Sequence, residues 1–279
     1  MSVRWLLEKD VFSEDLEPLK QEIVRQGHSF TEMGYIPFGG GEYEDIVGKD
    51  CTLFYGSLNL ALTLSRLPCP PVIFCDRPNY ECTKYYAYFG EYLLNQKYVM
   101  LPFSELRRRK DWLFDKIGEN GSMFVRPSSG AKIFTGMVIQ NDSFEHDYKL
   151  LGFYDVAPHA MVVVGQPHNI VREWRLVIAD DEVVAGSKYH DGTLSLMYEG
   201  FPESVGELAN RILSETSYRP DPVWTMDFCE TKDGRVHLLE IGGFSCAGLY
   251  LCEMAPIVSN VSRIAESVFN GEYDGRVAE

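Results

Sequence analysis

The feature that most constrains the fold is the segment WTMDFCETKDGRVHLLEI in the C-terminal third of the chain. Two strand-like runs flank Asp233-Gly234, a dipeptide typical of two-residue type I′ turns. Such a turn fixes the register of the hairpin, and that register places Asp227 directly opposite Glu240 on one face. We therefore expect antiparallel hairpins, and α+β character, in this half of the chain.

Two opposed carboxylates would repel each other, because facing β-carbons in such a pair lie about 5 Å apart. Something positive must compensate, and a divalent cation held by both Asp227 and Glu240 is the simplest answer. Oxygen ligands suit Mg²⁺, which keeps phosphate and water ligands of its own. The alternative is that both groups point to solvent. Phe228 and Leu239 can form a buried face on the other side of the hairpin, which favours the metal site over two solvent-exposed carboxylates.

A second hairpin, REWRLVIADDEVVAGSKYH, is predicted around a turn at Asp180-Asp181. Its register places Glu173 opposite Lys188, with Arg175 two residues along on the same face. We expect these three side chains to form one charged patch, a cationic wall for phosphate or carboxylate. Arginine suits such a wall because it binds these groups bidentately. An ordinary surface ion pair is the alternative.

A third element, MFVRPSSGAKIFTG, is predicted to form a strand, a loop of small residues and a second strand. Arg126 ends the first strand, and Lys132 follows the loop of Ser128, Ser129 and Gly130, whose backbone amides can approach an anion closely. A plain hairpin with edge cations is the alternative. Together the three elements match a nucleoside triphosphate with Mg²⁺. No P-loop or protein-kinase signature is present.

The composition limits the partners. The chain has 26 Lys and Arg against 41 Asp and Glu, a formal net charge of −15. So acidic a surface repels phosphate backbones, and we expect no broad nucleic-acid surface. No apolar run approaches the ~20 residues that cross a bilayer, so no membrane association is expected. The seven cysteines form no C-x-x-C pair, which is typical of reduced thiols in a cytoplasmic protein.

The order of elements predicts three domains. Residues 4–8 form a strand, 14–26 a helix and 51–57 a strand, and the last is followed by a helix with Ser57 as its N-cap. This alternation indicates a small α/β domain. Residues 80–120 are predicted to be mostly helical. The predicted domains are 1–75, 76–160 and 161–279.

The motifs FVRP, KIFTG, VVV, EWRLVI, VVAGSKY, MDF and LLEIGGFSCAGLY, in this order, resemble the ATP-grasp superfamily. More specifically they resemble its clade named for two arginines and a lysine. The resemblance covers roughly residues 80–270, and residues 1–70 resemble the small α/β domain that often precedes ATP-grasp lobes. It implies an α+β ATP-grasp fold, with ATP between two α+β lobes.

The resemblance also implies roles for individual residues. Those implied to bind ATP are Arg126, Lys132, Ser128, Ser129, Gly130, Val162, Val163, Val164 and Glu173, with the valine backbone reading adenine. Arg175 and Lys188 would stabilise an acylphosphate step, and Asp227 and Glu240 would bind Mg²⁺. The usual Glu-x-Asn ending reads Glu240-Ile241-Gly242 here. The asparagine ligand is missing, which puts a second metal ion in question.

The implied reaction joins a carboxylate to an amine at the expense of ATP, through an acylphosphate, with release of ADP and phosphate. The acceptors would be small-molecule or peptide carboxylates and amines, which the sequence does not identify. Candidate substrate contacts are Tyr35, Tyr55, Ser245 and Tyr250. A phosphotransferase on the same lobes and a non-catalytic ATP-binding module are the alternatives. Nothing in the sequence indicates the oligomeric state.

Overall fold

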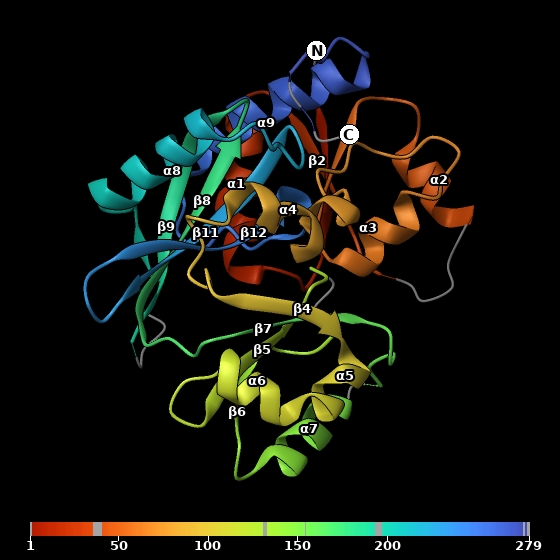
Figure 1. Cartoon of the computed structure of the whole chain (residues 1–279). Helices are drawn as coiled ribbons and strands as arrows, with labels where there is room; N and C mark the ends of the chain where they lie inside the picture. The colour runs from red at the N-terminus through yellow and green to blue at the C-terminus, as the bar shows by residue number, and fades with distance from the viewer. Residues whose placement is uncertain are drawn as a thin grey trace.

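The computed structural model describes residues 2–35, 41–130, 133–153, 155–192, 197–275 and 277. Within these ranges the strands form three sheets, whose orders are β2-β1-β3, β4-β7-β5-β6 and β10-β9-β8-β11-β12 (Figure 1). The first is parallel, and the other two are antiparallel. This is the α+β ATP-grasp arrangement expected from the sequence.

The N-terminal sheet is built by β1 (Arg4–Glu8), β2 (Ser29–Met33) and β3 (Thr52–Tyr55). Its helices are α1 (Ser13–Arg25), α2 (Gly41–Val47) and α3 (Leu58–Leu64). The Ser57 hydroxyl accepts a hydrogen bond of 3.3 Å from the backbone N–H of Leu60. The predicted N-cap of α3 is therefore confirmed, as are the strands and the helix predicted for this part of the chain.

The four-stranded sheet contains β4 (Tyr98–Pro102), β5 (Ser122–Pro127), β6 (Met137–Gln140) and β7 (Met161–Gly165). Helices α5 (Phe103–Arg108), α6 (Lys110–Lys116) and α7 (Phe144–Gly152) lie on the side away from the five-stranded sheet (Figure 1). Along β5, Met123 and Val125 are buried in this helical layer. Arg126 alternates with them and so faces the other lobe.

The five-stranded sheet consists of β8 (Ile170–Ala179), β9 (Glu182–Asp191), β10 (Tyr198–Glu199), β11 (Val223–Thr231) and β12 (Val236–Gly243). Helix α8 (Glu203–Glu215) packs on one face and α9 (Met254–Phe269) on the other. Both helices contribute a continuous apolar stripe to the core, as their helical spacing predicts. Among the described residues, no helix is long and apolar enough to cross a membrane.

The N-terminal unit, up to residue 75, shares one hydrophobic core with the five-stranded sheet and α9. Trp5 of β1 donates a hydrogen bond of 3.0 Å to Ser262 of α9, and its ring lies 6.4 Å from that of Phe244. Strand β7 belongs to the four-stranded sheet, so residues 161–165 pair with the lobe that precedes them and not with the one that follows. The three-domain division stays a prediction, and β7 assigns residues 161–165 to the four-stranded sheet.

Residues 76–97 connect the N-terminal unit to the four-stranded sheet. They form the short 3-10 helix η1 (Arg77–Tyr80) and helix α4 (Cys82–Phe89). The ring of Phe89 stacks 6.3 Å from that of Trp224 on β11, so α4 packs on the five-stranded sheet. A second short 3-10 helix, η2 (Phe244–Cys246), follows β12.

The two hairpin turns differ from each other. Asp180 and Asp181 both have positive φ, 53° and 67°, as a type I′ turn requires. At the other turn, Gly234 has φ 79° and its N–H donates to the carbonyl of Thr231, 2.8 Å away. Since Asp233 does not share the positive φ, the two-residue turn predicted there is wrong. A three-residue loop with glycine in the left-handed position takes its place.

Candidate active site

The carboxylates of Asp227 and Glu240 lie opposite each other on β11 and β12, as predicted. Two departures cancel to produce this register. The turn is one residue longer than expected, and Phe228 pairs with Leu238, which leaves Leu239 as the extra residue of a β-bulge. The predicted pairing of Asp227 with Glu240 is confirmed, although the longer turn and the bulge that produce it were not predicted.

Arg175 compensates the charge of Asp227. It lies opposite Asp227 on β8 and donates two hydrogen bonds to it, Nε to Oδ1 at 2.8 Å and Nη2 to Oδ2 at 2.6 Å. Its Nη1 donates to the carbonyl of Gly248 at 2.9 Å. Asp227 is only 2% exposed. Burial alone would lower the pKa of Arg175, but the Asp227 carboxylate together with Tyr250 and Tyr189 outweighs burial and raises it well above its ordinary value.

Arg126 compensates the charge of Glu240 from the other lobe. Its Nη2 donates to Glu240 Oε2 at 2.6 Å, and this pair joins β5 to β12. Burial lowers the pKa of Arg126, but the Glu240 carboxylate together with Tyr85, Tyr86 and Cys82 outweighs burial and raises it well above its ordinary value. The positive charge required by two facing carboxylates is therefore present, but arginines supply it. The sequence argument had assigned it to a metal ion.

Two tyrosines form the wall beside Arg175. The rings of Tyr189 and Tyr250 stack with centroids 4.7 Å apart, and the Arg175 guanidinium carbon lies 5.7 and 5.1 Å from their centroids. The Tyr189 hydroxyl donates to Glu173 Oε2 at 2.7 Å. Burial raises the pKa of Glu173, and this hydrogen bond opposes the shift. Glu173 thus lies on the same face as Arg175, as predicted.

Lys188 does not join this patch. Two bulges shift β9, so that Glu173 pairs with His190 and Lys188 pairs with Trp174. Successive residues of a strand point to opposite faces, so Lys188 lies on the face opposite Arg175. There its Nζ contacts Asp191 Oδ2 at 2.6 Å and the Tyr198 ring at 4.3 Å. The predicted contact with Glu173 is wrong, and the catalytic role of Lys188 stays a prediction that this geometry does not support.

The loop after Arg126 is tied to α4. The N–H of Ser128 donates to the carbonyl of Met161 at 2.9 Å, and the Ser128 hydroxyl accepts from the N–H of Thr83 at 3.1 Å. Because its amide is already paired, the approach of this N–H to an anion stays a prediction that the geometry does not support. The roles of Ser129 and Gly130 stay predictions, and Lys132 lies outside the described residues.

The prediction for Val162, Val163 and Val164 conflicts with the sheet. Strand β7 pairs with β4 on one side and β5 on the other throughout these residues. A strand with two neighbours has its backbone donors and acceptors occupied, so contact of the valine backbone with adenine stays a prediction that this pairing does not support. Residues 166–169 connect β7 to β8 across the two lobes and are the nearest backbone outside both strands.

The donor set fits one Mg²⁺ ion. Among the residues that the structure describes, no group of three or more His, Cys, Asp or Glu gathers around one point. Two carboxylates on adjacent strands still suit a cation that keeps water and phosphate ligands. At Gly242, an added β-carbon would lie 2.9 Å from Thr225 Oγ1. The position of the missing asparagine is therefore closed by a threonine hydroxyl.

The candidate substrate contacts divide into two groups. Tyr250 lies in the site, as described above. Tyr55 and Ser245 belong to the core, because both are fully buried. Tyr55 donates to Asp15 at 3.0 Å, and the Ser245 hydroxyl accepts from the N–H of Phe74 at 2.9 Å. Tyr35 is exposed. Tyr189 was not foreseen, since only the β9 bulge brings it onto this face.

Taken together, the three sheets and the arginine-paired carboxylates between the lobes define a protein of the ATP-grasp class. Residues 104–259, more than half of the chain, match the family model for an ATP-grasp domain, family 2 of the clade named for two arginines and a lysine. The chain therefore belongs to this family. A search of the curated proteins finds no match.

Solved structures agree with this fold. D-cycloserine synthetase DcsG superimposes with a TM-score of 0.68 at 13% identity, covering 95% of this chain and 100% of that one. D-alanine–D-alanine ligase from Bacillus anthracis gives 0.63 at 10% identity, covering 98% and 100%. The ATP-grasp ligase PsnB, in a complex with minimal precursor, Mg and ADP, gives 0.55 at 13% identity, covering 94% and 96%. At these identities the likeness concerns the fold.

Proposed function

We propose that the protein is an ATP-dependent ligase that joins a carboxylate to an amine through an acylphosphate. The observation that carries the proposal is the row Arg126, Glu240, Asp227 and Arg175, in which two facing carboxylates are flanked by an arginine from each lobe. Such a row offers guanidinium groups to the phosphate oxygens of ATP and carboxylates to its Mg²⁺ ion. The ligases that share this fold support the same class of reaction.

The chemistry splits one difficult substitution into two easier ones. A carboxylate oxygen attacks the γ-phosphorus of ATP, the bond to the β-phosphate oxygen breaks, and ADP leaves. The amine nitrogen then attacks the acyl carbon, and inorganic phosphate leaves. Negative charge grows on phosphoryl oxygens in the first step and on the acyl oxygen in the second. Fixed guanidinium groups stabilise both.

Individual residues receive roles from their positions. Arg126 and Arg175 would exchange their carboxylate partners for phosphate oxygens, which guanidinium groups bind with the same bidentate geometry. Asp227 and Glu240 would hold Mg²⁺, which when bound neutralises phosphate charge. Tyr189 orients Glu173 by its hydrogen bond and, with Tyr250, shields Arg175 from water. Backbone groups of residues 166–169 would contact adenine.

The test is release of ADP and phosphate in the presence of ATP, Mg²⁺ and panels of acids and amines. A ligase releases both products only when an acid and an amine are present together. ADP release with one acceptor and no free phosphate would favour a phosphotransferase instead.

A non-catalytic ATP-binding module is the second candidate, because Thr225 closes the position of the asparagine ligand at Gly242. Nucleotide binding with Mg²⁺ but no turnover by any pair of acceptors would favour that function.

A further inference from the structure

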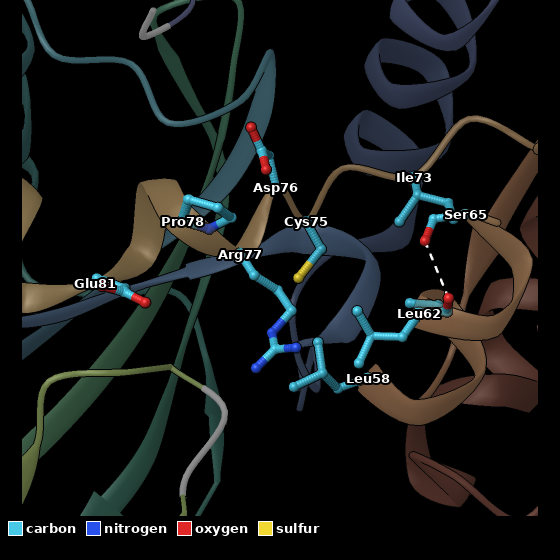
Figure 2. A pocket seen from close by; sticks show the side chains of 10 residues that line it. Leu58, Leu62, Ser65, Ile73, Cys75, Asp76, Arg77, Pro78 and Glu81 are labelled. Atoms are coloured by element: carbon cyan, nitrogen blue, oxygen red, sulfur yellow. Dashed lines mark hydrogen bonds between the residues drawn. The ribbon is translucent and has the colours of Figure 1, made fainter. Parts of the chain in front are cut away.

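A cavity of about 530 Å³ lies between α3 and the segment that leads into η1. One wall is apolar and is formed by Leu58, Ala61, Leu62 and Ile73. The other wall carries the Cys75 thiol and the Arg77 guanidinium (Figure 2). This volume suits a small molecule, since ligand sites commonly measure about 300–1,000 Å³.

Arg77 is the cation of this cavity, and among the described residues no carboxylate forms an ion pair with it. Figure 2 shows its side chain extending toward Leu58 and Cys75, while the Asp76 carboxylate points away. Asp76 instead accepts a hydrogen bond of 3.1 Å from Asn79. The Arg77 Nε is buried and has no hydrogen-bond partner within the described ranges. A buried donor of this kind is costly unless a ligand satisfies it.

The cavity adjoins the proposed nucleotide site on two sides. Cys75 lies against the end of β12. A β-carbon added to Gly243, three residues after Glu240, would lie 2.7 Å from the Sγ of Cys75. On the other side, Glu81 lines the cavity, and the next residue, Cys82, donates its N–H to the carbonyl of Ser128 at 2.9 Å. A molecule in the cavity therefore lies between the strand of Glu240 and the loop that follows Arg126.

We infer that this cavity binds one acceptor of the reaction, a small aliphatic carboxylate of amino-acid size, through a salt bridge to Arg77. A guanidinium matches a carboxylate bidentately, and the surrounding apolar wall strengthens the pair by excluding water. Leu58, Leu62 and Ile73 take the aliphatic part. Glu81, which also lines the cavity, would favour an ammonium on the same molecule. The inference rests on the proposed function for the role of the ligand, but binding itself does not require turnover.

The test measures binding without ATP, by saturation-transfer NMR with leucine, isocaproate and isocaproamide as probes. We expect the wild type to bind leucine and isocaproate and to discriminate against isocaproamide, which lacks the carboxylate. Arg77→Gln should weaken isocaproate binding at least about tenfold, the effect of losing a charge-assisted hydrogen bond. Arg107→Gln is the matched control, because Arg107 is exposed on α5 and pairs with Glu145.

A second variant and a second readout keep the inference separate from folding. Leu62→Phe narrows the cavity without touching Arg77 and should also weaken isocaproate binding. Bound isocaproate should slow alkylation of Cys75 by iodoacetamide, while the exposed Cys69 reports the uninhibited reaction. Equal binding of isocaproate and isocaproamide, unchanged binding by Arg77→Gln, or no binding of either carboxylate would overturn the inference.

The proposed function can fail independently. If Arg77→Gln still joins an acid to an amine with an unchanged KM for the acid, the cavity is not the acceptor site, but the proposed ligase function stands. If carboxylates bind in a way that depends on Arg77 but no pair of acceptors is turned over, the cavity assignment stands and the proposed ligase function fails.

Discussion

Replacing Arg175 by methionine should leave the Asp227 carboxylate buried without its guanidinium partner. The pair is almost fully enclosed, with side-chain exposures of 12% for Arg175 and 3% for Asp227. Methionine fills much of the same space, so the change keeps most of the packing while it removes the charge, both hydrogen bonds to Asp227 and the one to the carbonyl of Gly248. Breaking a buried pair in this way costs about 3–5 kcal/mol. A loss of about 4 kcal/mol lowers the folding equilibrium constant by roughly a factor of 10³.

Urea unfolding of the wild type and of Arg175→Met measures this loss. Arg172→Met is the matched control, because Arg172 lies on the same strand and makes a similar 2.8 Å contact with Glu230, but its side chain is 47% exposed. An exposed pair contributes about 0–1 kcal/mol. If Arg175→Met lowers the free energy of unfolding no more than Arg172→Met does, the claim that the buried Asp227 carboxylate needs a positive partner is refuted.

Magnesium should separate the variants further. In Arg175→Met the facing carboxylates lack one of their two arginines, so Mg²⁺ alone should restore part of the lost stability. The double variant Arg175→Met with Asp227→Asn should not respond, because one carboxylate ligand is gone. An equal response of both variants would show that the ion acts elsewhere.

Three further predictions concern other parts of the chain. Burial raises the pKa of Asp221 to about 7, against about 3.9 in an unfolded chain. The folded protein therefore holds a proton that the unfolded chain releases, and its stability should fall as pH rises from about 4 to 7. Asp221→Asn should flatten that decline in urea unfolding between these pH values; an equally steep decline would contradict it. Arg126→Ala should weaken binding of a non-hydrolysable ATP analogue by at least about tenfold in calorimetry, since a charge-assisted contact is lost; unchanged affinity would count against its role. Ser57→Ala should cost about 1 kcal/mol of unfolding free energy through loss of the α3 cap, and a neutral result would mean that the 3.3 Å bond to Leu60 contributes nothing.

Local signals in the sequence were sufficient for much of the fold. The strand predicted at 4–8 has the bounds of β1, and the strand predicted at the start of MFVRPSSGAKIFTG lies within β5. Both are short apolar runs with clear breaks at their ends, which is where pattern reasoning works best. The strand β4 was missed inside a region predicted to be mostly helical. Its sequence, YVMLP, has no periodicity of its own, and it becomes a strand only by pairing with β7.

The candidate site was predicted in composition but less well in geometry. The structure brings together the four charged residues Arg126, Arg175, Asp227 and Glu240. The facing carboxylates are compensated by positive charge, as expected. What the sequence could not show is that Arg126 reaches Glu240 across 114 positions of the chain. Bulges caused the largest error, because one extra residue in β9 moves Lys188 to the far face and brings Tyr189 to the near one.

The most direct measurement of the central claim is calorimetric titration of ADP with and without Mg²⁺ into the wild type, Glu240→Gln and Asp227→Asn. The account predicts that Mg²⁺ tightens ADP binding to the wild type and that either substitution removes this enhancement while the melting transition persists. Mg²⁺-dependent binding of equal strength in all three proteins would contradict it.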